Sequence, residues 1–149
     1  MESNLNIIEQ QTPDLPRVRI LAPHIIYVKE LEKPLPEDVL FSAQEVSRLG
    51  NDWEHFGIVV EFSSMVVPSP EVRHRVSKEL ARINQKLVGV AVVSNTNIFL
   101  KIGFKFIAQF AGFSNISFHP TKDSALKHLT TLNTNRSELI NSLSGHRHR

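Results

Sequence analysis

Short apolar runs rich in β-branched residues recur along this chain, and segments with helical spacing separate them. The clearest run, 56–62, reads Phe-Gly-Ile-Val-Val-Glu-Phe, and 88–93 is a second one. A run of this length is typical of a strand that is buried on both faces, as the strands of parallel sheets are. Because strands that alternate with helices are joined by right-handed crossovers, the pattern predicts an α/β fold with a mostly parallel sheet.

The remaining segments extend this alternation. The runs 18–21 and 25–28 are split by Ala22-Pro23-His24 and predict an interrupted strand or a hairpin, which adds an antiparallel edge. A short strand is expected over 116–119, where Pro120 closes it. The sequence therefore predicts four to five strands and about four helices. We expect the helices over 37–49, in a segment that opens at Ser69, over 97–111 and over 121–132.

The length of 149 residues predicts a single domain. We expect a flexible N-terminal segment over 1–15, the α/β domain over 16–132 and a polar C-terminal tail over 133–149. The chain has no cysteine, which excludes disulfides, thiol catalysis and cysteine-ligated metals. No signal peptide is apparent, and no apolar stretch approaches the roughly 20 residues of a membrane span, so we expect a cytoplasmic protein without a transmembrane segment.

Charge is distributed unevenly along the chain. Residues 1–61 contain five lysines and arginines against eleven acidic residues, whereas residues 62–149 contain twelve against four. Such a chain can fold with an acidic side and a basic side. That arrangement suits a partner whose surface carries charge of one sign, or head-to-tail association of two copies. The alternative is that the charges are scattered over a solvated exterior.

Ser69 is the first candidate functional residue. It precedes Pro70 and Glu71, the residues that suit the first turn of a helix, so it is a natural N-cap. A phosphoryl group on the same hydroxyl would meet the free N–H groups of the helix N-terminus. Both a structural cap and a phosphorylated switch are therefore consistent with this position.

The strand ends supply a second candidate site. In open α/β sheets, ligands bind outside the carboxyl ends of the strands. Hydroxyl, amide and imidazole groups gather at these positions and predict an edge that can bind an anion or a small polar ligand. The alternative is that they only cap the helices that follow. The residues are Ser63, Ser64, Ser94, Asn95, Thr96 and His119.

The segment 97–111 is too apolar for a helix that covers one face of a sheet. Its polar positions are confined to one stripe, although such a helix normally has a broad polar face. The excess apolar surface predicts contact with a second copy, another protein, a small apolar ligand or a membrane surface. The alternative is that other parts of the chain cover it. We expect the partner surface to include Phe99, Lys101, Lys105, Phe106 and Phe110.

Signals of catalysis and of nucleic-acid binding are missing from the sequence. There is no glycine-rich phosphate loop, no zinc-protease motif and no nucleophile elbow. A basic stripe lacks the interleaved aromatic residues of a nucleic-acid surface, so we interpret it as a solvated face. We expect no enzyme activity, no cofactor, no metal and no nucleic-acid partner. The stripe consists of Arg75, Lys78, Arg82 and Lys86.

From about residue 56 to 132, the chain resembles the STAS-like (SpoIIAA-like) domains of anti-sigma-factor antagonists. Four passages carry the resemblance. They are Ile58-Val59-Val60-Glu61-Phe62, the helix that opens at Ser69, Val90-Ala91-Val92-Val93-Ser94-Asn95 with the Phe-rich helix after it, and Ile116-Ser117-Phe118-His119-Pro120 with the Asp123-to-Leu129 helix. The resemblance implies a non-catalytic domain that binds another protein, and sometimes a nucleotide or an apolar ligand.

Phosphorylatable members of this family carry a serine at the start of the corresponding helix. Ser69 occupies a similar place, but Val67-Pro68-Ser69-Pro70-Glu71 lacks the usual preceding acid and following small residue. We therefore expect a regulatory, protein-binding module, with a homodimer and control at Ser69 as further hypotheses. The alternative is a carrier or sensor of a small apolar or lipid-like ligand, held under the helix over 97–111.

Overall fold

The computed structural model describes residues 16–31, 35–62, 69–94 and 115–147. A five-stranded sheet in the order β1-β2-β3-β4-β5 forms its centre. The first pair is antiparallel and the other three pairs are parallel, so the sheet is mixed, with the expected antiparallel edge. The strands are β1 (Val18–Ala22), β2 (Ile25–Glu30), β3 (Phe56–Phe62), β4 (Leu87–Val93) and β5 (Ile116–His119).

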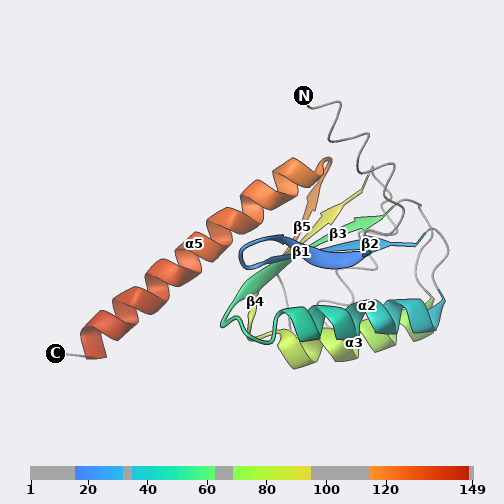
Figure 1. Cartoon of the computed structure of the whole chain (residues 1–149), viewed down its shortest axis with the longest axis horizontal. Coiled ribbons are helices and arrows are strands. Elements are labelled where there is room, and N and C mark those ends of the chain that lie inside the picture. Colours follow the sequence, from blue (N-terminus) through green and yellow to red (C-terminus); the bar gives the residue numbers. More distant parts are fainter. Residues whose placement is uncertain (1–15, 32–34, 63–68, 95–114, 148–149) are drawn as a thin grey trace.

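Helices cover both faces of the sheet (Figure 1). The helices α2 (Pro36–Leu49) and α3 (Pro70–Ile83) lie side by side on one face, and α5 (Lys122–Arg147) crosses the other. The general α/β class is confirmed. The described part of the chain contains three helices where about four were expected, and the helix predicted over 97–111 lies outside it. None of the described helices has the length and hydropathy needed to cross a membrane.

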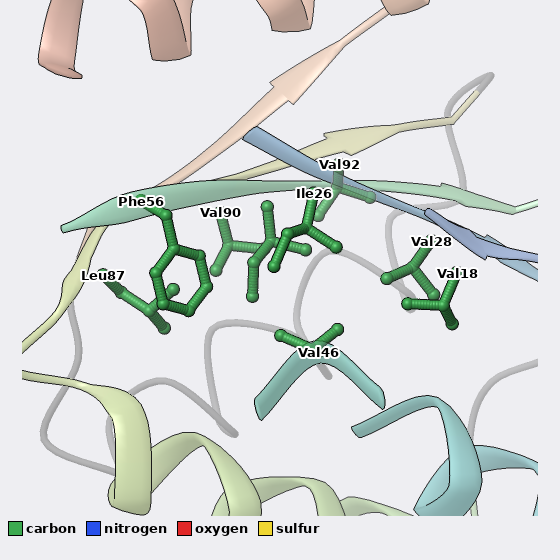
Figure 2. Packing of buried hydrophobic residues seen from close by; sticks show 9 residues of the cluster. Val18, Ile26, Val28, Val46, Phe56, Leu87, Val90 and Val92 are labelled. Carbon is green, nitrogen blue, oxygen red and sulfur yellow. The ribbon is translucent and has the colours of Figure 1, made fainter. Parts of the chain in front are cut away.

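Two apolar layers hold these elements together because successive strand residues point to opposite faces of the sheet. Ile26 and Val28 of β2 point toward α2 and α3 and join the cluster drawn in Figure 2. Ile25 and Tyr27 point to the other face, where Ala125 and Leu129 of α5 pack. β4 is buried along its whole length, as its continuous apolar run predicted.

Local signals fix where the helices on the first face begin. The Ser69 hydroxyl accepts a hydrogen bond from the Val72 amide at 3.2 Å, and Pro70 takes the first helical position. At α2, the Asp38 carboxylate accepts from the Leu35 amide at 2.9 Å and satisfies one backbone donor at the helix start. Ser69 is therefore an N-cap, as the sequence indicated.

Helix α5 is longer than expected. We predicted a helix ending near Leu132 followed by a polar tail, but the helix continues to Arg147. The chain beyond Leu132 is polar, but it does not interrupt the helix, since it has no proline and its apolar residues keep helical spacing. Threonine side chains also bond within the helix: the Thr134 hydroxyl donates to the Thr130 carbonyl at 3.0 Å. Asn133 and Ser137 lie beside the sheet and use their polar groups there, whereas most of the later positions are exposed.

Two glycines let α5 lie close to the strands. A β-carbon added to Gly57 would lie 3.0 Å from Leu129 Cδ2, and one added to Gly89 would lie 2.9 Å from Leu132 Cδ1. Side chains at these strand positions would push the helix outward. The first turn of α5 follows the end of β5 after two residues and therefore lies at the carboxyl edge of the sheet, where the candidate site lies.

Candidate functional site

His119 is at the centre of a polar group at the carboxyl edge of the sheet. It ends β5, and its carbonyl accepts a hydrogen bond from the Ser94 amide at the end of β4 (3.2 Å). Its imidazole lies between two hydroxyls: Nδ1 is 2.9 Å from Ser124 Oγ and Nε2 is 2.8 Å from Ser117 Oγ. The fold thus unites Ser94 and His119, two of the residues expected at this edge.

The surroundings of His119 favour the neutral imidazole. Burial lowers the pKa of His119 below its ordinary value, and the neighbouring His128 lowers it further. The two rings have centroids 5.2 Å apart. A neutral imidazole has one donor nitrogen and one acceptor nitrogen, and each can pair with one of the two serine hydroxyls. His119 is therefore a positioned hydrogen-bonding group at neutral pH.

Tyr27 organises a second group on the same face of the sheet. Its ring is buried, and its hydroxyl donates a hydrogen bond to the Glu61 carboxylate on β3. Two cations lie against the ring: Arg19 Cζ is 4.8 Å and Lys122 Nζ is 4.6 Å from the ring centroid. Both distances are in the range of cation–π contacts. Tyr27 thus positions a guanidinium and an ammonium near one carboxylate.

The first turn of α5 joins the two groups. Lys122 contacts Tyr27, whereas Ser124, two residues later, contacts His119. We call the combined set the edge cluster: Arg19, Tyr27, Glu61, Ser117, His119, Lys122, Ser124 and His128. Lys29 lies two residues from Tyr27 on the same face of β2, so three cations lie at this edge with the carboxylates of Glu61 and the exposed Asp123. The cluster can therefore donate hydrogen bonds and attract an anionic group.

Besides Ser94 and His119, the structure describes one sequence-predicted site residue, Ser69. Ser69 is exposed at the start of α3. The remaining edge candidates and the whole partner surface lie outside the described residues. These are Ser63, Ser64, Asn95, Thr96, Phe99, Lys101, Lys105, Phe106 and Phe110.

Sequence reasoning missed the Tyr27 group. Arg19 and Tyr27 are direct partners across the antiparallel pair β1–β2, and Lys122 reaches the Tyr27 ring from the first turn of α5 on the same face of the sheet. An arginine and a tyrosine inside otherwise apolar strand runs are a weak signal of such a cluster. The register of the hairpin and the angle of α5 bring them together, and neither can be read from residue spacing.

A second polar network lies near the opposite edge of the sheet, around the buried His55. His55 Nδ1 donates to Asn133 Oδ1 at 3.2 Å, and the Ser137 hydroxyl donates to His55 Nε2 at 3.1 Å. The Asn133 amide donates to the His24 carbonyl at 3.0 Å, and Gly57 N donates to the same carbonyl at 2.8 Å. His24 has a positive φ of 62° and stacks on both His55 and Trp53. The network fastens α5 to the β1–β2 turn and to the start of β3.

Ser137, His55 and Asn133 are connected in the order of a nucleophile, a base and an orienting group. Ser137, however, lies inside α5, where the backbone N–H groups are used by the helix itself. They cannot turn toward a developing oxyanion, and such donors contribute much of the rate in acyl transfer. We therefore interpret this network as a structural connection between α5 and the sheet.

A shallow groove of about 340 Å³ lies between the ends of α2 and α3. Lys86, one of its lining residues, donates to the carbonyl of Asn51 at 3.0 Å, and Glu79 lies 3.5 Å from Arg82. These three charged side chains of the groove thus already have partners within the described part of the chain. Within the described ranges, no cluster of three or more histidine, aspartate or glutamate side chains is placed to hold a metal ion.

No protein-family model matches the chain, and comparisons with curated proteins and with solved structures find no similar protein. The edge cluster therefore has to be interpreted from its own chemistry. It combines half-exposed cations, a neutral imidazole and hydroxyls on a rigid sheet edge.

Proposed function

We propose that this chain is a non-catalytic regulatory module of STAS-like type that binds an acidic segment of another protein at the edge cluster. The observation that carries the proposal is the placement of Arg19 and Lys122 against the buried Tyr27 ring. The two cations come from distant parts of the sequence, Arg19 from β1 and Lys122 from α5, and each of them is partly exposed. A partner carboxylate can reach both of them without entering the core.

Rigidity supports this interpretation. Tyr27 is 3% exposed, so its ring acts as a support for the cations and does not itself meet the partner. Glu61 holds the tyrosine hydroxyl in place from the neighbouring strand. Positioned cations lose less conformational freedom on binding than free lysine and arginine side chains, which favours affinity. His119 and its two serines add hydrogen-bonding groups beside the charged pair.

The STAS-like part of the proposal is supported by the element order. The strands that carry the resemblance, β3, β4 and β5, lie side by side in one sheet, and α5 follows β5 as that family's closing helix would. In the proposed architecture, a fourth helix over 97–111 completes a mostly parallel fold. Control at Ser69 and a cytoplasmic homodimer belong to the same proposal, and a phosphoryl group on Ser69 would occupy an exposed helix N-terminus.

The experiment uses the full chain as an affinity bait in two charge-matched forms. One form carries Arg19→Ala with Lys122→Ala, and the other carries Lys127→Ala with Arg136→Ala, both on exposed positions of α5. We expect proteins with acidic segments to bind the wild-type chain and the Lys127→Ala/Arg136→Ala control. The same proteins should not bind the Arg19→Ala/Lys122→Ala edge variant. Each protein found is then purified, and its Kd is measured by titration calorimetry.

A loss of affinity of tenfold or more in the edge variant alone would support the proposal, provided that its thermal midpoint stays near that of the wild type. Equal weakening by the control pair would show that only the overall charge matters. A partner that binds both variants as tightly as the wild type would place the recognition surface elsewhere.

A further inference from the structure

The end of α5 extends beyond the sheet. The helix has 26 residues, which corresponds to a length of about 39 Å. Ser137 still bonds to His55 beside the sheet, but the helix then continues away from the strands, toward the C-terminus in Figure 1. Leu139 and Leu143 on this part are 56% and 57% exposed. We call residues 138–147 the arm.

The apolar stripe of α5 does not stop where the sheet ends. Ala125, Leu129 and Leu132 pack on the strands, and the same alternating spacing of four and three leads through Arg136 to Leu139 and Leu143. This is the spacing of a helix that packs against another helix. Apolar side chains that continue a packing stripe into solvent mark a surface for another chain.

A complementary surface lies on α2. Phe41 is 56% exposed, and Glu37 and Glu45 lie one turn before and one turn after it. Glu45 also pairs with Arg48 of the same helix at 2.8 Å, so among the described residues Glu37 is the exposed carboxylate beside Phe41 that has no ion-pair partner. The helix has three acidic residues and one basic one. In contrast, Arg136 lies one turn before Leu139, and residues 144–149 add two arginines and two histidines. An exposed apolar residue on a net acidic helix thus corresponds to an apolar stripe that follows Arg136 and precedes a basic C-terminal sequence.

The two surfaces cannot meet within one chain. α2 and α5 lie on opposite faces of the sheet, and the arm extends away from α2 (Figure 1). We propose that the arm of one copy packs on the Phe41 face of α2 in a second copy. This contact differs from the one expected through residues 97–111 and does not depend on the function proposed for the edge cluster.

The proposed contact is small, so the association should be weak and should be sought at high protein concentration. Three half-exposed apolar side chains are few for a permanent dimer, which buries on the order of 1,200–2,000 Å². We therefore expect a weak, reversible association that depends on protein concentration. Reciprocal contacts between two copies would close a two-fold dimer, whereas a one-sided contact would extend into longer assemblies.

Sedimentation of the full chain tests the proposal. We expect the weight-average mass to rise from 16.9 kDa toward twice that value as the concentration increases. Leu143→Glu and Phe41→Glu should each keep the mass at that of one chain. Asn141→Glu, which places the same charge on the arm away from the leucine stripe, should associate like the wild type. A wild type that stays monomeric at all concentrations would overturn the proposal. Wild-type-like association of Leu143→Glu or of Phe41→Glu would overturn it as well.

Cross-linking identifies the contact independently of any loss of association. The chain has no cysteine, so one can be introduced at a chosen position. We expect Phe41→Cys mixed with Leu143→Cys to form a mixed disulfide dimer under mild oxidation. The mixture of Phe41→Cys with Asn141→Cys should form at least fivefold less of the mixed disulfide dimer. If Leu143→Cys instead cross-links preferentially to itself, two arms pair with each other and α2 is not the partner surface.

Discussion

Single side chains decide where the helices begin, and Ser69 is the clearest case. Its hydroxyl satisfies the Val72 amide, which would otherwise lack a partner in the first turn of α3. We expect Ser69→Ala to lower the free energy of unfolding by about 0.5–2 kcal/mol, measured by urea denaturation. Ser69→Asp keeps a capping oxygen and should retain most of the stability. An unchanged free energy of unfolding in Ser69→Ala would mean that the hydroxyl does not stabilise the start of α3.

His119 should titrate below the ordinary histidine value of about 6.5. Burial is the main cause of its lowered pKa, and the charge on His128 is the second. His128→Gln should therefore raise the pKa of His119 only in part. Proton NMR titration of the ring C–H signals in both proteins measures this directly. A His119 pKa at or above the ordinary value in the wild type would contradict the contacts of its ring.

The same shift has a defined sign for stability. Because the folded state binds the His119 proton more weakly than the unfolded state does, protonation favours unfolding. The contribution of His119 is thus present above the unfolded-state pKa and is lost as the pH falls through the folded-state pKa. We expect the unfolding free energy to fall less steeply with decreasing pH below about 6.5 in His119→Gln than in the wild type. Denaturation curves across this pH range provide the comparison, and identical slopes would contradict it.

At the scale of elements, the position of α5 depends on one buried amide. Asn133 is 8% exposed and connects the helix to both His55 and the His24 carbonyl. Replacing it leaves buried polar groups without partners, so we expect Asn133→Ala to lower the free energy of unfolding by about 1–3 kcal/mol. Asn135→Ala, an exposed neighbour on the same helix, should change it by less than about 0.5 kcal/mol. Equal stability of the two variants in urea would show that packing alone holds the helix.

The elements themselves were predicted with differing success, for local reasons. The strands over 56–62 and 88–93 were predicted correctly because both of their faces are covered. A strand of this kind has a nearly continuous apolar sequence, which is easy to recognise. The capped start of α3 was found because Ser69, Pro70 and Glu71 act within one turn. The end of α5 was missed because a helix that leaves the sheet carries few apolar residues, and the sequence of 133–149 was interpreted as a tail.

At the scale of the whole molecule, the proposed contact joins the acidic α2 of one copy to the arm of another copy, which Arg136 precedes and which ends in a basic sequence. Contacts between exposed charges are screened as the ionic strength rises. We therefore expect self-association through the arm to weaken between about 0.05 M and 0.5 M salt, measured by sedimentation at one protein concentration. Association that strengthens with salt would indicate an apolar contact to which the charges contribute nothing.

The sequence by itself determined the α/β class, the apolar strands and the capped start of α3, and it offered the antiparallel edge as one of two possibilities. Each of these depends on residues within a few positions of one another, where periodicity and backbone hydrogen bonding act. Only the tertiary structure decided that Arg19 and Lys122 meet at Tyr27, and that His24, His55 and Asn133 form one network. These residues are up to 109 positions apart. The strand register and the angle of α5 across the glycines of β3 and β4 bring them together, and both follow from packing of the whole domain.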